Sequence, residues 1–266
     1  WDKSNHPGMT SQFCGMVDLR AKQGFTVYQT NLRSDMGAAD RYWIDGGMPK
    51  GAEDLPNVAF YQQELDRRMA YIADAGLVNA LGQSWAFSIR GEHGVEHQKH
   101  LARYLVARYG AYPMVWTLAG EVAGYGEENR AAFVEGWREV ALEIEARDGY
   151  GHLATAHYTN ERPFADYYQD ELWMDFTLNQ AGHGDYLIKA SDYYDYLAKY
   201  GDKPFVEGEA LYEFCSTLEE MGTRLCTADM LRRVAYICMQ AGGAGYTYGA
   251  QGIWDNVWES PKELDP

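Results

Sequence analysis

Two glutamates, Glu121 and Glu209, follow short apolar segments that have the composition of β-strands. Hydrolysis of a glycosidic bond needs two carboxyl groups, one to protonate the leaving oxygen and one to attack the anomeric carbon or activate water. In a parallel β/α barrel, the residues that follow the strands share one face. We therefore interpret Glu121 as the general acid/base and Glu209 as the nucleophile of a retaining mechanism, with carboxyl carbons about 5–5.5 Å apart.

A simpler interpretation of each glutamate stays open. A single glutamate at a strand end usually belongs to an ion pair or to a charged rim, and two such residues weaken that interpretation without removing it. Gly120, next to Glu121, has no side chain, so a ligand can approach Glu121 closely. Glu207 has the same strand parity as Glu209 and is expected one layer deeper in the barrel.

Polar and aromatic side chains also follow the other expected strands, where they can bond to hydroxyl groups or stack on sugar rings. For His157, a hydrogen-bonding role inside the core is an equal alternative. For Trp254, simple packing is the alternative. The expected substrate-binding residues are Asn31, Arg33, Gln83, Trp85, His157, Asn179, Tyr248 and Trp254.

No metal or organic cofactor is expected. His93, His97 and His100 have the spacing of one helical face, which resembles a metal site. No H-E-x-x-H signature accompanies them, and the helices of a barrel lie outside it, so a solvated face is the better interpretation. The four cysteines include no C-x-x-C pair, which argues against a disulfide framework.

Short β-branched or aromatic segments alternate with longer helical patterns, which is typical of βα units. Gly24 is expected to end the first helix, and Asn57 and Gly76 are expected to cap and to end the second. The nucleotide-binding fingerprint of a doubly wound sheet is missing, which favours a barrel. Strands are expected at 25–32, 77–81, 114–118, 152–156, 173–178, 205–209 and 244–248, and helices near 10–22, 57–75, 94–109, 128–147, 186–200 (capped by Asp185) and 228–241.

These elements predict an α/β fold, a parallel (β/α)8 TIM-type barrel, as a single catalytic domain over residues 1–266. The expected strands number one too few, so we expect that this sequence lacks the first strand and the last helix of the barrel. The natural polypeptide would then be longer at both ends. Two alternatives stay open: the expected strands 25–32 and 244–248 pair directly in a seven-stranded barrel, or the long segment 33–56 supplies the eighth strand.

Charge and composition restrict the partners. The chain has 23 Lys and Arg against 39 Asp and Glu, a net charge of −16, which disfavours nucleic acids and anionic membranes. No stretch approaches the roughly 18 apolar residues of a membrane span. Aromatic residues make up 14% of the chain and favour a carbohydrate partner weakly. The sequence does not indicate an oligomeric state.

Five segments together resemble the apiosidase-like glycosidases: Gly24–Val27, Ala107–Gly110, Val115–Glu121, Pro204–Glu213 and Gly243–Trp254. They occur in the family's order over most of the chain, and the last two are the more specific. The resemblance implies a bacterial enzyme with a barrel catalytic domain that acts on plant-type polysaccharides, in the periplasm or outside the cell.

The family's acid/base follows barrel strand four and its nucleophile follows strand seven, which the resemblance carries onto Glu121 and Glu209. The chain departs from the family at one point, because Ala119-Gly120-Glu121 stands where relatives often have Gly-Gly-Asp. The longer side chain puts the partner geometry of Glu121 in question. A catalytically inactive sugar-binding barrel is the alternative function, and neither the sugar nor its linkage follows from the sequence.

Overall fold

The computed structural model describes residues 11–32, 55–126, 128–160, 164–182, 189–219, 222–251 and 253. The chain divides into two compact units, which are described separately. The N-terminal unit extends to His157 and includes Asp170–Met174; the C-terminal unit comprises Tyr158–Gln169 and the chain from Asp175 onward. The expectation of one catalytic domain over the whole chain stays a prediction. Most of segment 33–56, the alternative eighth strand, lies outside the described residues.

The N-terminal unit is built on a parallel sheet in the order β1 (Val27–Asn31), β2 (Val78–Trp85) and β3 (Met114–Gly120). The central strand β2 is buried along almost its whole length, as expected for a parallel strand covered on both faces. The expected strand 152–156 is reduced to a single parallel bridge between Trp116 and Ala154. The sequence therefore predicted the place of this segment but overestimated its length.

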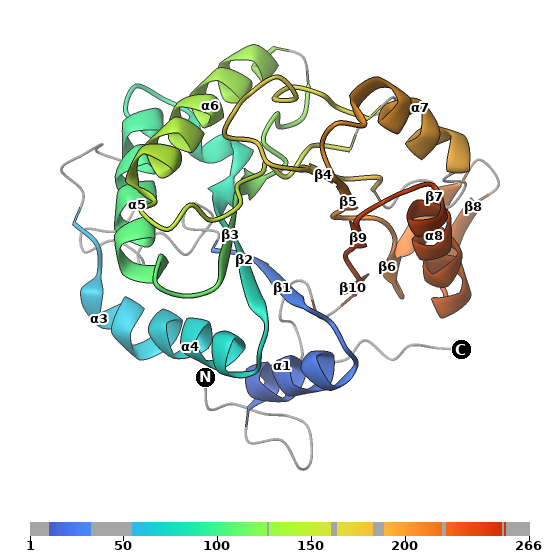
Figure 1. Ribbon diagram of the computed structural model, residues 1–266, viewed down its shortest axis with the longest axis horizontal. Coiled ribbons are helices and arrows are strands. Elements are labelled where there is room, and N and C mark those ends of the chain that lie inside the picture. The colour runs from blue at the N-terminus through green and yellow to red at the C-terminus, as the bar shows by residue number, and fades with distance from the viewer. Residues whose placement is uncertain are drawn as a thin grey trace. The chain divides into compact units, whose positions relative to one another are not determined.

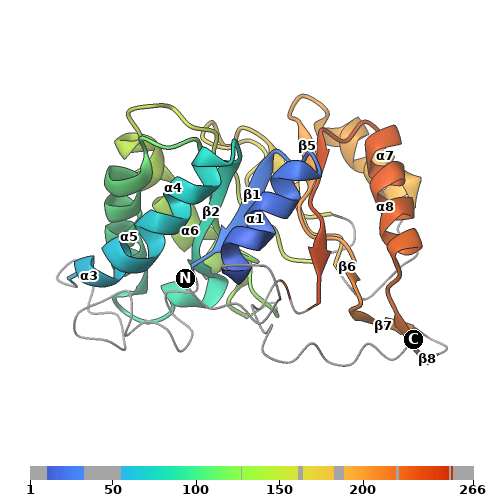
Figure 2. The same cartoon turned by 90° about the horizontal axis from the view of Figure 1, so that it is seen from below.

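Helices lie side by side along the outer side of this curved sheet (Figures 1 and 2). They are α1 (Gln12–Lys22), the continuous helical stretch of α3 (Val58–Phe60), η1 (Tyr61–Leu65) and α4 (Asp66–Asp74), then α5 (Gly94–Tyr109), which the short η2 (Ala86–Ile89) precedes, and α6 (Arg130–Arg147). Val17, Ile72 and Leu77 form the buried cluster under α1 and α4.

Side-chain caps and glycines fix the ends of these helices. The sequence predicts Asn57, Gly24 and Gly76 in these roles, but not the cap Ser11. The Ser11 hydroxyl accepts the N–H of Cys14 at 3.2 Å, and the Asn57 side chain accepts the N–H of Phe60 at 3.3 Å. Gly24 follows α1 at φ +86° and Gly76 follows α4 at φ +81°. Both glycines form Schellman-type ends, in which their own N–H and the next N–H bond to carbonyls of the last helical turn.

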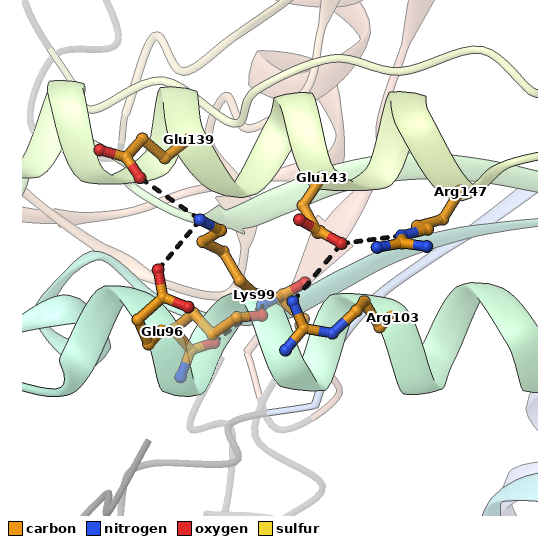
Figure 3. A network of polar contacts seen from close by, with 8 residues as sticks. Glu96, Lys99, Arg103, Glu139, Glu143 and Arg147 are labelled. Atoms are coloured by element: carbon orange, nitrogen blue, oxygen red, sulfur yellow. Dashed lines mark hydrogen bonds and ion pairs between the residues drawn. The ribbon is translucent and has the colours of Figure 1, made fainter. Parts of the chain in front are cut away.

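Ion pairs join α5 to α6 on the surface (Figure 3). Lys99 lies between Glu96 of its own helix, at 3.0 Å, and Glu139 of α6, at 3.5 Å. Glu143 of α6 in turn contacts Arg103 at 3.4 Å and Arg147 at 2.9 Å. Such exposed pairs contribute about 0–1 kcal/mol each, so the main stabilisation of this helix pair comes from the apolar side chains beneath it.

The C-terminal unit has a second parallel sheet in the order β4 (Thr177–Asn179), β5 (Phe205–Glu207) and β9 (Gly245–Tyr246). The helices α7 (Ala190–Tyr200) and α8 (Ala228–Gln240) pack against it through one apolar core. The aromatic rings of Tyr193, Tyr196 and Phe205 meet there, with ring centroids 5.3–5.4 Å apart where they contact Phe205. This core fixes β5 against α7.

Several boundaries in this unit differ from the expectation, and β9 covers only Gly245–Tyr246 of the expected strand 244–248. Residues 173–176 precede β4 as irregular backbone, so only the end of the expected strand 173–178 is a strand. Strand β5 ends at Glu207 rather than at Glu209. Helix α7 begins at Ala190 with Lys189 at its N-cap position, and Asp185 lies outside the described residues.

The sequence did not predict four short strands. They are β6 (Tyr212–Glu213) paired in parallel with β10 (Gly249–Ala250), and the hairpin of β7 (Ser216–Glu219) and β8 (Gly222–Leu225). The strands of the described residues form four separate sheets and no closed barrel. In the same part of the chain, no helix is both long and apolar enough to cross a membrane. All four cysteines are free thiols.

Substitution of a helix-terminal glycine tests the geometry of the helix end directly. A Cβ at Gly76 would meet no atom within 4 Å, so Gly76→Ala introduces only the strain of a left-handed backbone. We expect it to lower the free energy of unfolding by about 1–2 kcal/mol in urea titrations. Gly149 is equally open but does not have a left-handed φ. The control Gly149→Ala should therefore be neutral or slightly stabilising; equal losses at both positions would contradict this account.

Candidate active site

Glu121 has an unusual backbone conformation. It directly follows β3, its φ is +54°, and only 6% of its surface is exposed. A left-handed backbone costs a residue other than glycine roughly 1–2 kcal/mol. Such strain persists only where the surroundings enforce it, and it gathers at functional sites. The strain is the first sign that Glu121 is more than a rim charge.

The contacts of Glu121 hold this conformation. Its N–H donates to Nδ1 of His157 at 3.4 Å, and the next N–H, of Val122, donates to the carbonyl of His157 at 3.0 Å. The hydroxyl of Tyr125 donates to Oε1 of Glu121. Because Nδ1 of His157 accepts, a neutral ring carries its proton on Nε2. His157 is 5% exposed, which supports its role as a hydrogen-bonding group in the core; a contact with sugar stays a prediction.

Trp85 lies at the end of β2, against Gly120. A Cβ on Gly120 would lie 2.6 Å from the indole ring, so only glycine allows this packing. The indole Nε1 of Trp85 is buried and has no hydrogen-bond partner among the described residues. The glycine thus makes room for an aromatic ring next to Glu121, where the sequence suggested room for a ligand.

Asn31 and Gln83 are tied into the sheet and its helices. The Asn31 side chain donates to the carbonyl of Ser84 at 2.6 Å, across the ends of β1 and β2. The Gln83 side chain is 3% exposed and donates to the backbone and the side chain of Gln98 on α5, at 2.9 Å each. These contacts give both residues a structural role, and their binding of substrate stays a prediction.

In the C-terminal unit, Glu209 follows the end of β5 and is half-buried. Its backbone is held on both sides, because its carbonyl accepts the N–H of Gly182 at 2.9 Å and its N–H donates to the carbonyl of Asn179 at 3.2 Å. Glu207 is fully buried beneath it, as its strand parity predicts. Asn179, at the end of β4, donates its side-chain N–H to Oε2 of Glu207 at 3.1 Å.

Burial raises the pKa of Glu207 above its usual range, although hydrogen bonds from Ala181, Asn179, Tyr193 and Glu209 oppose the rise. The carboxyl group of Glu207 also influences a neighbouring thiol. Burial, together with the negative charge of Glu207, raises the pKa of Cys238 to about 12.

Tyr248 follows β9, is half-buried, and donates its hydroxyl to Oε2 of Glu213. Its predicted contact with substrate stays a prediction. Arg33 and Trp254, the remaining predicted binding residues, lie outside the described residues.

The helical histidines form no metal site. His93 is exposed, whereas His97 is 4% exposed, so the expectation of a solvated face is wrong for His97, which points into the packed side of α5. No group of three or more His, Cys, Asp or Glu side chains in the described part of the chain is arranged to hold a metal ion.

Two residues of the candidate site were missed by sequence reasoning. Tyr125 donates a hydrogen bond to the Glu121 carboxylate. The sequence feature that could have indicated it is its position four residues after Glu121, between two glycines. Tyr193 of α7 donates to Glu207 at 3.0 Å, and no sequence pattern links that helix to the end of β5. Long-range contacts of this kind need the fold.

Comparison with known families assigns the chain. A family model described as the apiosidase-like catalytic domain matches residues 6–264. The chain belongs to the apiosidase-like family. Its members' catalytic domain is that of a glycoside hydrolase, so this apiosidase-like chain is a glycoside hydrolase-like domain. No curated protein sequence matches it.

Solved structures show the same fold for the apiosidase-like chain. A glycoside hydrolase family 5 protein from Bacteroides vulgatus matches with a TM-score of 0.71 at 20% identity, covering 93% of this chain and 56% of that one. The chain thus spans little more than half of that structure. Cel5A of Thermotoga maritima, solved with cellobiose, matches at 0.59 and 14% identity, covering 91% and 83% of the two chains.

A third structure, the endo-1,4-β-mannanase of Rhizomucor miehei, has a TM-score of 0.60 at 12% identity, with 91% of this chain and 83% of that one covered. At these identities the likeness establishes the fold alone. The apiosidase-like chain is accordingly an α/β protein with parallel sheets of the glycoside hydrolase family 5 type.

The strain at Glu121 can be measured by substitution. Glu121→Ala and Glu121→Gly lose the same carboxylate contacts, but only glycine relieves the left-handed backbone. We expect Glu121→Gly to be more stable than Glu121→Ala by about 1–2 kcal/mol in urea unfolding. At a position with an ordinary φ the order is reversed, because alanine restricts the unfolded chain. An alanine variant that is the more stable of the two would show that Glu121 is unstrained.

The raised pKa of Glu207 predicts a pH dependence of stability. A carboxyl group whose pKa is higher in the folded than in the unfolded protein stabilises the fold while it is protonated. Its stabilisation is complete below the unfolded pKa, about 4.3, and is lost as the pH rises through the folded pKa. Glu207→Gln does not titrate, so its stability deficit against the wild type should be larger at pH 4 than at pH 8.

Glu143 provides the opposite case. Hydrogen bonding to Arg147, followed by the charge of Arg103, lowers the pKa of Glu143. Ionised Glu143 stabilises the fold above its unfolded pKa, and this stabilisation is lost as the pH falls. The loss in the free energy of unfolding caused by Glu143→Gln should therefore grow from pH 4 to pH 8. Urea midpoints across this range decide both cases, and the same slope for the two variants would contradict the assignment.

Proposed function

We propose that the chain is the catalytic domain of a retaining glycoside hydrolase that cleaves a plant-type polysaccharide or oligosaccharide by double displacement. Glu121 is the general acid/base and Glu209 the nucleophile. The observation that carries the proposal is the strained, buried Glu121 directly after β3, whose carboxylate is bound by Tyr125. Glu209 supports it, because it lies two residues after the end of β5 in the other unit, on a backbone held by hydrogen bonds on both sides.

In the first step, a carboxylate oxygen of Glu209 attacks the anomeric carbon while Glu121 gives its proton to the departing glycosidic oxygen. The bond to the leaving group breaks, and an ester joins the sugar to Glu209. In the second step, Glu121 takes a proton from water as that water attacks the same carbon and releases Glu209. Two displacements on one carbon leave the anomeric configuration unchanged.

We further propose that the parallel strands of both units belong to a (β/α)8 barrel. The fold likeness to glycoside hydrolase family 5 structures supports this arrangement. So do the helices that connect consecutive parallel strands within each unit. In such a barrel the residues after β3 and β5 face one catalytic side. The net charge of −16 favours a neutral carbohydrate over an anionic one.

Substitution of the two carboxyl groups tests the mechanism on aryl glycosides, furanosides and pyranosides included. Glu209→Gln should lower kcat by about three orders of magnitude or more on every substrate. Glu121→Gln should lower it by about 10²–10⁴-fold on phenyl glycosides. The loss should be far smaller on dinitrophenyl glycosides, whose leaving group needs no proton. Glu139→Gln, which removes a surface partner of Lys99, is the control and should leave kcat unchanged.

The stereochemistry gives an independent result. Proton NMR of the first product formed should show the anomeric configuration of the substrate. Inversion would reject Glu209 as the nucleophile. Sugar binding without hydrolysis by the wild-type chain would instead support the inactive sugar-binding alternative.

A further inference from the structure

Glu207 occupies a site that is saturated with hydrogen-bond donors. Its residue is 0% exposed. Oε1 accepts the backbone N–H of Ala181 at 3.0 Å and that of Glu209 at 3.3 Å. Oε2 accepts the side-chain N–H of Asn179 at 3.1 Å and the hydroxyl of Tyr193 at 3.0 Å. Three of these four donors cannot accept a hydrogen bond in return, so the carboxyl group serves them as an acceptor.

The two backbone donors belong to the segments that hold Glu209. Beyond its bond to Glu207, the N–H of Glu209 also lies 3.2 Å from the carbonyl of Asn179, and the preceding N–H, of Gly208, donates to that carbonyl at 2.7 Å. The carbonyl of Glu209 accepts the N–H of Gly182, one residue after Ala181. Oε1 of Glu207 thus joins the segment after β4, at Ala181, to the segment after β5, at Glu209. These hydrogen bonds fix the backbone of Glu209.

We propose that Glu207 is a positioning residue, whose buried carboxyl group sets the location of Glu209 for attack on the anomeric carbon. The proposal rests on the proposed function for the role of Glu209 as nucleophile. Glu207 does not touch the substrate in this account, because it has no exposed surface and its two oxygens already accept four donors. Its effect passes through the backbone of Glu209.

Two substitutions separate positioning from proton transfer. In Glu207→Gln, the amide oxygen can keep the bonds to Ala181 and Glu209. The new NH2 group then needs acceptors, and the Oδ1 of Asn179, which has no hydrogen-bond partner among the described residues, can supply one if that amide turns over. The Tyr193 hydroxyl can accept as well. In Glu207→Leu, the volume is similar but all four donors lose their acceptor.

The positioning role predicts that Glu207→Gln retains kcat within about threefold of the wild type. A misplacement of about 1 Å can lower the rate by about 100-fold, so Glu207→Leu should lose kcat on that order while KM changes little. Activities are measured on the best aryl glycoside, with circular dichroism to confirm the fold. Asp166→Leu is the control: it removes a carboxylate of the same unit that binds Lys199 and Tyr200 at the surface, and kcat should not change.

Each other outcome overturns the proposal. If folded Glu207→Gln is as inactive as Glu207→Leu, the reaction needs the ionisable group of Glu207 and not only its hydrogen-bond acceptors, which rejects a positioning role. If both variants keep wild-type kcat, Glu207 has no part in the reaction. Should Glu207→Leu fail to fold, Glu207→Asp replaces it, because the shorter side chain draws the carboxylate away from the N–H groups of Ala181 and Glu209.

Crystal structures of the variants keep this test independent of the proposed function. If the wild type hydrolyses no aryl glycoside, the proposed function fails, but the location of Glu209 is still readable. A displaced Glu209 in Glu207→Leu or Glu207→Asp, with an unmoved one in Glu207→Gln, sustains the positioning role. An unmoved Glu209 in all variants rejects it.

Discussion

Parallel pairing brings the carboxyl ends of neighbouring strands to one edge of a sheet. The buried polar residues at those ends must then find their hydrogen-bond partners in the same small region. In the C-terminal unit this constraint is met at Glu207. Its full burial would be costly for a lone carboxylate, and donors from β4, from the segment after it, from α7 and from Glu209 remove much of that cost. The same bonds fix the backbone on which Glu209 sits, so stability and the location of the proposed nucleophile depend on one carboxyl group.

The N-terminal unit meets the same constraint in a different way. Here the polar residue after β3 is held by strain as well as by hydrogen bonds. Glu121 adopts a left-handed backbone because His157 and Tyr125 engage its N–H and its carboxylate. The indole of Trp85 packs over Gly120 and leaves no room for a side chain there. The backbone strain at this turn accompanies a buried carboxyl group, which is the combination found at functional sites.

The sequence predicted those parts of the molecule that local chemistry controls. Helix α5 has the expected bounds, and the cap Asn57 and the terminal glycines Gly24 and Gly76 act as expected, because each acts on backbone groups within a few residues of itself. The apiosidase-like family and the deep location of Glu207 also followed from motif and strand parity.

What the sequence could not predict depends on contacts between distant segments. The expected strand 152–156 shrinks to one bridge, and the hairpin of β7 and β8 went unnoticed, because strand length is set by the partner and not by composition alone. The hydrogen bond from Tyr193 to Glu207 joins residues 14 apart through a helix packed on the sheet. Likewise, the burial of His97 reflects the packing of α5 on η2 and α6 rather than any pattern in its own helix.

The central claim is that Glu209 forms a covalent bond to the sugar. A 2-deoxy-2-fluoro aryl glycoside slows the release of such an ester and allows it to accumulate. After incubation with the intact chain, mass spectrometry should show one added fluoroglycosyl group per molecule, and peptide mapping should place it on Glu209. A label on another carboxylate, or stoichiometric release of the aryl group without any covalent adduct, would contradict the account.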